Sequence, residues 1–237
     1  NGAAIAAIHG VGIDGVRDFI AKVTGTNPIA SEMLAIGAGR GIELSPLQLA
    51  AAYTILPNNG VKISPRSLRA VYDGENEIET HEPNATRVVG AGAPFIVTRM
   101  LQSVIGDGSD GQYGTAKIAR KLSDLESVEL AGKTGTGDND LWFVGFTARV
   151  VVVVWVGFDN NFPTFEASKG FTGSRLPLQI WARFMKDLKK SRPNLLKGSF
   201  TMPLGVRALT IDPIAGCTSK NGIKEYYLID RLPPVCY

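Results

Sequence analysis

Apolar positions in the first half of the chain recur at helical spacing, in short segments that glycine and proline separate. Four helices are predicted on this basis, over residues 3–8, 14–23, 45–57 and 94–105. Ser45 followed by Pro46 is the clearest helix start, because serine caps a helix end and proline suits the first turn. Asp14 is predicted to cap the second helix in the same way.

Strand patterns dominate the second half of the chain. Strands are predicted over residues 128–134, 141–147 and 150–158, after an earlier hairpin at 68–72 and 77–80. Tight turns join the three later strands, which predicts an antiparallel meander. The last strand is apolar on both faces, so helices are expected on both sides of the sheet. A helix over residues 178–190 is one such cover, and proline-rich residues 193–237 are predicted to form a small tail or appended subdomain.

The amino-acid composition argues against several classes of function. The chain has 237 residues, and its 25 Lys and Arg against 22 Asp and Glu are scattered, which argues against nucleic-acid binding. No apolar run approaches the roughly 18 residues that cross a bilayer. Two histidines and two cysteines make no recognisable metal site, and Cys217 and Cys236 are either bridged or two free thiols. Because the first residue is Asn1 and not methionine, we expect a piece of a longer protein.

The segment Lys133-Thr134-Gly135-Thr136 is the strongest candidate for chemistry, and it has three interpretations. It fits a polar strand end, or the end of a phosphate-binding loop, although Ser127 stands where that loop needs its first glycine. It also fits the lysine-threonine-glycine element of the active-site serine acyl enzymes.

The surrounding residues favour the third interpretation. Residues 131–136, 138–147 and 153–160 read AGKTGT, DNDLWFVGFT and VVWVGFDN, and together they resemble the transpeptidase domain of class A penicillin-binding proteins. The similarity extends over roughly residues 1–190, and Gly114-Thr115-Ala116 resembles the small segment before the lysine-bearing strand. The resemblance implies an α/β fold of the penicillin-binding, serine β-lactamase-like class, N-terminally truncated, with an antiparallel sheet covered by helices on both faces. Residues 1–192 are then a partial transpeptidase domain, and 193–237 a tail.

The function that the resemblance implies is peptidoglycan D,D-transpeptidation, in which serine acyl transfer cross-links stem peptides ending in D-Ala-D-Ala. β-Lactam antibiotics are expected to bind the same site, and no cofactor is implied. The parent is expected to be a membrane-anchored bifunctional enzyme with a glycosyltransferase domain, on the periplasmic face of the bacterial inner membrane. Two alternatives stay open: a hydrolytic relative, either a D,D-carboxypeptidase or a β-lactamase, and a non-catalytic penicillin-binding-like module.

The resemblance also assigns roles to residues. Lys133 supplies positive charge for a carboxylate and for proton transfer, and the hydroxyls of Thr134 and Thr136 bind that carboxylate. The backbone N–H of Thr136 is expected to be an oxyanion-hole donor. Gly135 lets a peptide approach the strand edge, and Trp142 is expected to line the cleft.

Two motifs of the family are incomplete in this sequence. No serine is followed three residues later by lysine, so the Ser-x-x-Lys nucleophile is expected outside these residues. Asn1, followed by an apolar helix, resembles the last residue of the Ser-x-Asn motif and joins Lys133 and Thr136 in the predicted catalytic set. The chain alone is therefore predicted to be inactive.

Overall fold

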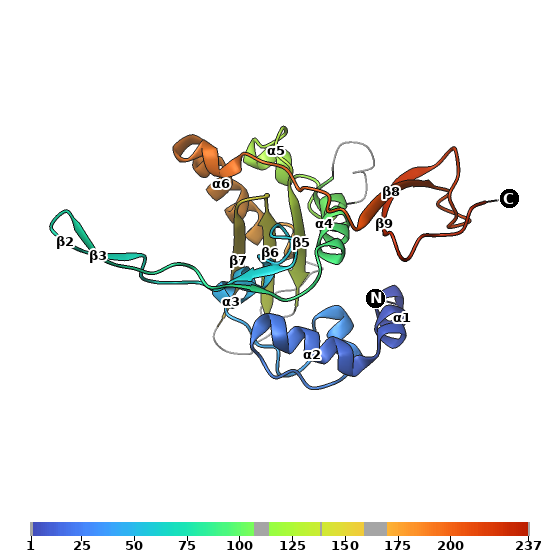
Figure 1. The fold of residues 1–237 in the computed structure, drawn as a ribbon, viewed down its shortest axis with the longest axis horizontal. Coiled ribbons are helices and arrows are strands. Elements are labelled where there is room, and N and C mark those ends of the chain that lie inside the picture. Colours follow the sequence, from blue (N-terminus) through green and yellow to red (C-terminus); the bar gives the residue numbers. More distant parts are fainter. Residues whose placement is uncertain (1, 107–113, 138, 159–169, 237) are drawn as a thin grey trace. The chain divides into compact units, whose positions relative to one another are not determined.

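The computed structural model describes residues 2–106, 114–137, 139–158 and 170–236 (Figure 1). The chain divides into two compact units: Asn1–Ile55 with Val61–Val88, and Leu56–Gly60 with Val89–Tyr237. The predicted division at residue 192 is a different one, and it remains a prediction. No helix in the described ranges is both long and apolar enough to cross a membrane.

The first unit contains short helices and two-stranded sheets. Its helices are α1 (Gly2–Val11), α2 (Ile13–Thr24), the 3₁₀ helix η1 (Glu32–Ile36) and α3 (Pro46–Tyr53). Its strands pair as β1 (Val61–Ile63) with β4 (Ala85–Arg87), and β2 (Ala70–Asp73) with β3 (Asn76–Thr80). The β2–β3 hairpin confirms the prediction at residues 68–80, whereas η1 and the β1–β4 pair were not predicted.

The two predicted helix caps have different outcomes. Ser45 caps α3 as predicted: its hydroxyl accepts from the Gln48 N–H, while the Gln48 side chain accepts from the Ser45 N–H. Asp14 does not cap α2, because Gly12 occupies the cap position and Asp14 lies in the first turn, where it pairs with Arg17 at 2.7 Å. The carboxylate still favours that helix end, since it faces the positive end of the helix dipole.

The second unit contains the predicted meander. Its strands are β5 (Ala131–Thr136), β6 (Asp140–Phe146) and β7 (Val151–Gly157), in the order β5-β6-β7 and antiparallel throughout. Its helices are α4 (Gly92–Ile105), α5 (Ala119–Ser123), α6 (Leu176–Ser191) and the 3₁₀ helix η3 (Pro193–Leu196). Strands β8 (Val206–Ile211) and β9 (Ile223–Leu228) form a hairpin in the region predicted as a tail. The predicted first strand begins three residues later than expected, at Ala131.

The core of this unit lies between the sheet and α6, which Figure 1 shows lying against β6 and β7. Trp181 of α6 is fully buried, meets the ring of Phe143 edge-to-face at 5.3 Å, and donates its indole N–H to the Gly145 carbonyl. A Cβ atom at Gly145 would lie 2.4 Å from that indole ring. The absence of a side chain at position 145 therefore makes the space that Trp181 fills.

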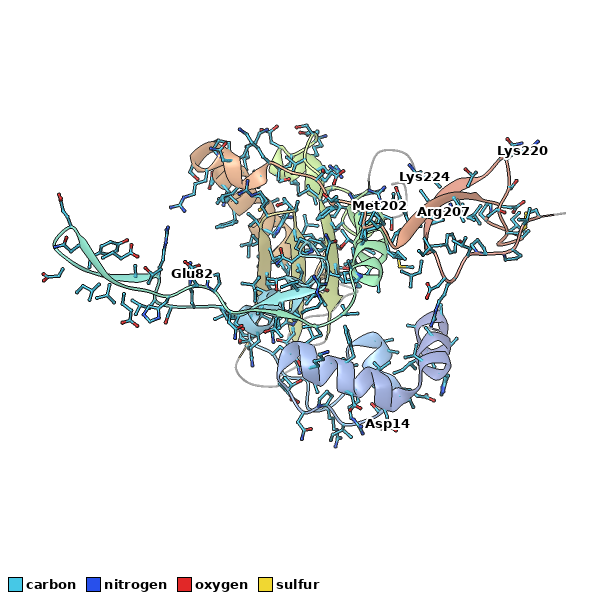
Figure 2. The ribbon with its side chains drawn as sticks, in the orientation of Figure 1. Asp14, Glu82, Met202, Arg207, Lys220 and Lys224 are labelled. Atoms are coloured by element: carbon cyan, nitrogen blue, oxygen red, sulfur yellow. A yellow bond between two sulfur atoms is a disulfide. The ribbon has the colours of Figure 1, made fainter. Side chains whose placement is uncertain are left out.

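The C-terminal hairpin packs against the first turns of α4 (Figure 1). Phe95 meets Tyr226 edge-to-face at 5.4 Å, and the Arg99 guanidinium lies over the same tyrosine ring. Figure 2 shows Arg207 and Lys224 on the two strands and Lys220 on the loop between them.

A disulfide closes the loops beyond this hairpin. Cys217 is bonded to Cys236, which settles the alternative left open by the sequence. Nearby, the Asp212 carboxylate accepts hydrogen bonds from the N–H groups of Ala215 and Ile214, and these hold the pKa of Asp212 below its usual value. The backbone of this region is thus fixed by covalent and polar contacts, where it has little apolar core.

We predict that Gly145→Ala destabilises the second unit by about 1–3 kcal/mol, because the added methyl group overpacks the site that Trp181 fills. Gly205→Ala is the matched control, since a Cβ there meets nothing within 4 Å. Urea unfolding followed by tryptophan fluorescence measures both variants. Equal stability of the two would show that Trp181 does not require the glycine.

We predict that replacing Cys217 and Cys236 by serine costs the tail about 3 kcal/mol, the loop-closure entropy of a bridge spanning 19 residues. Amide hydrogen exchange should quicken at residues 206–236 and stay unchanged in α6. Uniform acceleration over the whole second unit would instead mean that the tail and the sheet unfold together.

Candidate active site

Strand β5 lies at an edge of its sheet. Among the described residues it pairs only with β6, in a register that places Gly135 opposite Trp142 and Thr134 opposite Phe143. The Gly137 N–H donates to the Asp140 carbonyl at 2.8 Å, and hydrogen-bonded pairs alternate along an antiparallel ladder. The backbone groups of Lys133 and Gly135 therefore turn toward β6, and those of Thr134 and Thr136 turn outward to the edge.

Side chains alternate between the two faces of the same strand. Lys133 and Gly135 share one face, and Thr134 and Thr136 share the other. The Lys133 side chain is exposed, and its Nζ donates to the Thr134 carbonyl at 2.7 Å. Because that carbonyl points outward, the lysine amine lies at the strand edge, beside the outward backbone groups.

The hydroxyl of Thr134 has a partner outside the strand. Its Oγ1 lies 3.1 Å from the Oγ1 of Thr115, and either hydroxyl can donate. Thr115 precedes Ala116, which is fully buried in the core and donates its N–H to the Val104 carbonyl of α4. The last turn of α4 therefore holds Thr115 next to Thr134.

The hydroxyl of Thr136 has its partner in a segment that follows β5 in the sequence. Its Oγ1 accepts a hydrogen bond from the Gly173 N–H at 3.0 Å. Gly173 is buried, and a Cβ there would lie 2.3 Å from the Gly135 carbonyl oxygen and 2.5 Å from that of Trp142. Only a glycine lets this segment approach the sheet closely enough to reach Thr136.

Gly135 and Trp142 lie together on the face of Lys133. A Cβ at Gly135 would lie 3.0 Å from the Cβ of Trp142, so a side chain there crowds the sheet as well as any ligand on it. The Trp142 ring is half-buried and packs on Trp155 with 6.1 Å between centroids, and the Trp155 indole N–H donates to Asp140. The role of Trp142 as a cleft wall stays a prediction.

The structure thus brings four of the predicted residues, Lys133 to Thr136, onto one strand edge, with Trp142 on the neighbouring strand. Asn1, the remaining predicted catalytic residue, lies outside the described residues. Sequence reasoning missed the contacts of Thr115 and Gly173. The sequence does mark Gly114-Thr115-Ala116, as a small segment that precedes β5. No sequence pattern marks Gly173, which lies 37 residues from its partner Thr136.

The arrangement suits an extended ligand that carries a carboxylate. Outward N–H and C=O groups can pair with a peptide backbone, and a cation with two hydroxyls can bind a carboxylate. In the described ranges, no group of three His, Cys, Asp or Glu side chains could hold a metal ion.

Comparison with known proteins identifies the class. The model of the penicillin binding protein transpeptidase domain matches residues 8–170, so the chain belongs to that family. Penicillin-binding protein 1A of Aquifex aeolicus (strain VF5) is 34% identical over 197 residues, which cover 82% of this chain and 25% of that protein. Penicillin-binding protein 2D of Bacillus subtilis (strain 168) is 30% identical over 81% of the chain and 27% of its own length.

Solved structures agree with this assignment and confirm the predicted fold class. The crystal structure of penicillin-binding protein 1A from Haemophilus influenzae superposes with a TM-score of 0.85 at 25% identity, over 99% of this chain and 39% of that one. Penicillin-binding protein PonA1 from Mycobacterium tuberculosis has a TM-score of 0.60 at 20% identity, over 81% of this chain and 53% of that one, and supports the fold alone. The chain is therefore a part of a class A penicillin-binding protein transpeptidase domain, and it spans about a quarter of the length of the first curated relative.

We predict that Gly173→Ala separates residues 172–175 from β5, because the methyl group cannot fit against the Gly135 and Trp142 carbonyls. Hydrogen exchange of the backbone amide at position 173, which donates to Thr136 Oγ1, should quicken at least tenfold, the loss of about 1.4 kcal/mol of protection. Ser174→Ala is the control, since it removes only the contact with the Thr172 hydroxyl. Unchanged exchange in Gly173→Ala would contradict the close approach.

Proposed function

We propose that this chain carries the substrate-binding strand of a peptidoglycan D,D-transpeptidase, which cross-links stem peptides by serine acyl transfer and is acylated by β-lactams. The observation that carries the proposal is the outer edge of β5, which pairs with no second strand among the residues that the structure describes. There the outward backbone of Thr134 and Thr136, their hydroxyls and the Lys133 amine lie within one short strand. The transpeptidase family of the chain supports it.

In this proposal the donor peptide lies along the outward edge of β5. Its terminal carboxylate binds between the Thr134 and Thr136 hydroxyls, with Lys133 supplying the opposite charge. Gly135 has no side chain that would obstruct the peptide, and the Trp142 ring lines the cleft on the same face of the sheet. The Thr136 N–H, turned to the edge, is one donor to the oxyanion of the tetrahedral intermediate, a contribution of about 3 kcal/mol.

The chemistry proceeds in two steps. A serine outside these 237 residues attacks the carbonyl of the D-Ala-D-Ala bond, and its proton passes to a base. The intermediate collapses, the C–N bond breaks, and D-alanine leaves as the protonated amine. An amine of a neighbouring stem then attacks the acyl-enzyme ester, forms the cross-link and releases the serine.

The remaining predictions about the parent are part of this proposal. Asn1 is proposed to assist the nucleophile as the last residue of Ser-x-Asn, and residues 193–237 to follow the transpeptidase domain as an appended subdomain. The parent is proposed to be anchored at the periplasmic face of the inner membrane and to carry a glycosyltransferase domain. The Cys217–Cys236 disulfide supports the location, because disulfides persist in oxidising compartments.

Fluorescent penicillin tests the function. In the parent protein, Lys133→Ala should slow covalent labelling about 10- to 100-fold, the contribution of a charge-assisted hydrogen bond. Folding should be kept, since the Lys133 side chain is exposed. Lys121→Ala removes an exposed lysine from α5 and is the matched control.

Two further measurements define the reaction. The 237-residue chain by itself should form no covalent adduct, because it has no Ser-x-x-Lys. The parent should transfer its acyl group to an added amine in preference to water, and hydrolysis alone would identify a carboxypeptidase or β-lactamase. Wild-type labelling in Lys133→Ala would refute the role of the strand edge.

A further inference from the structure

The contact between Thr115 and Thr134 has a consequence for ligand binding. Each hydroxyl holds one proton, so in a pair only one hydroxyl donates to the other. When Thr115 donates, the proton of Thr134 is free to point toward a ligand. When Thr134 donates, its proton is used within the protein and its lone pairs face outward.

We propose that Thr115 is a positioning residue that donates to Thr134 and so directs the Thr134 proton at the carboxylate of the acyl donor. The inference rests on the proposed function. An anionic acceptor at the strand edge selects this direction, since a hydrogen bond to a carboxylate is stronger than one between neutral hydroxyls.

The neighbouring hydroxyl shows the same arrangement with a fixed direction. The Gly173 N–H can only donate, so Thr136 Oγ1 is the acceptor of that bond. The Thr136 proton is thereby left for another acceptor. Each of the two carboxylate-binding hydroxyls then accepts a hydrogen bond from within the protein: Thr136 from the Gly173 N–H, and Thr134 from the Thr115 hydroxyl.

The backbone around Thr115 fits a positioning role. A Cβ at Gly114 would lie 2.4 Å from the Val104 carbonyl oxygen and 2.6 Å from that of Ser103, so residue 114 lies directly on the end of α4. Ala116, on the other side, is fully buried. Thr115 is therefore an exposed side chain between two residues that both contact the end of α4.

Arg120 links the end of α4 to the residues that lead into β5. Its Nε donates to the Gly106 carbonyl at 2.6 Å, just beyond α4, and its NH1 donates to the Val128 carbonyl at 2.7 Å, shortly before β5. One side chain thus joins the end of α4 to the start of the strand. Thr115 lies against the end of α4, and Thr134 belongs to β5. The Arg120 hydrogen bonds therefore hold together the two elements that carry the hydroxyl contact.

The test measures acylation of the parent by a penicillin with a free carboxylate and by its methyl ester. Thr115→Val keeps the shape of the side chain and removes the donor, so acylation by the acid should slow about two- to tenfold. Acylation by the ester should not change, because the oriented proton has no carboxylate to meet. Thr115→Ser restores a hydroxyl and should restore the rate with the acid.

A double variant separates positioning from a structural effect. In a Thr134→Val background, Thr115→Val should cause no further loss, because the group that it orients is gone. Equal slowing of acid and ester, a further loss in that background, or a wild-type rate in Thr115→Val would each overturn the inference. Should Thr115→Val lower the thermal midpoint, Thr115→Ala replaces it under the same criteria.

If the proposed function is wrong, the same experiment gives a different result. A wild-type parent that forms no adduct with the free-acid penicillin overturns the function, and the inference with it. A wild-type parent that is acylated normally while Thr115→Val matches it overturns the inference alone.

Discussion

The packing of Trp181 on Gly145 is the contact on which the second unit depends. A fully buried indole of α6 packs on the middle strand of the sheet, and the space for that indole exists because position 145 has no side chain. The same face of the sheet carries Phe143, whose strand partner is Thr134. The core packing therefore supports the sheet directly next to the strand edge that carries the candidate site.

The site itself consists of a strand supported by elements from both directions in the sequence. Thr115 comes from the segment before β5, and Gly173 from the segment before α6. Neither contact adds much to stability, since a net hydrogen bond contributes about 1 kcal/mol. Their effect is orientation: the Gly173 N–H leaves the Thr136 proton for another acceptor, and in our proposal Thr115 does the same for Thr134.

Local signals explain what the sequence predicted well. The capping box at Ser45 and Gln48, the turn at Asp73 and Gly74, and the β-branched run of β7 all act over a few residues. The lysine-threonine-glycine strand was recognised with its neighbours because the resemblance spans a continuous stretch. The register that separates Lys133 from the threonines follows from simple alternation along that strand.

The misses have a shared physical cause. The β1–β4 pair joins two three-residue strands through 21 intervening residues, and no local pattern marks such short pairings. The hairpin of β8 and β9 was hidden by the prolines around it, which lie outside the paired residues. Gly12 displaced Asp14 as a cap because the chain turns there at a φ of 92°, which glycine adopts without strain.

The contact of α4 with the C-terminal hairpin bears on the order in which the chain becomes structured. A Cβ at Gly92, in the first turn of α4, would lie 2.4 Å from the side chain of Leu228, which is 136 positions later. During synthesis at about 5–20 residues per second, roughly 7 to 27 seconds pass between the synthesis of Gly92 and that of Leu228. Its other end meets β5 much sooner, about 30 residues after it. The C-terminal end of α4 can therefore reach its partner before the first turns can, because those turns pack against residues as late as Leu228.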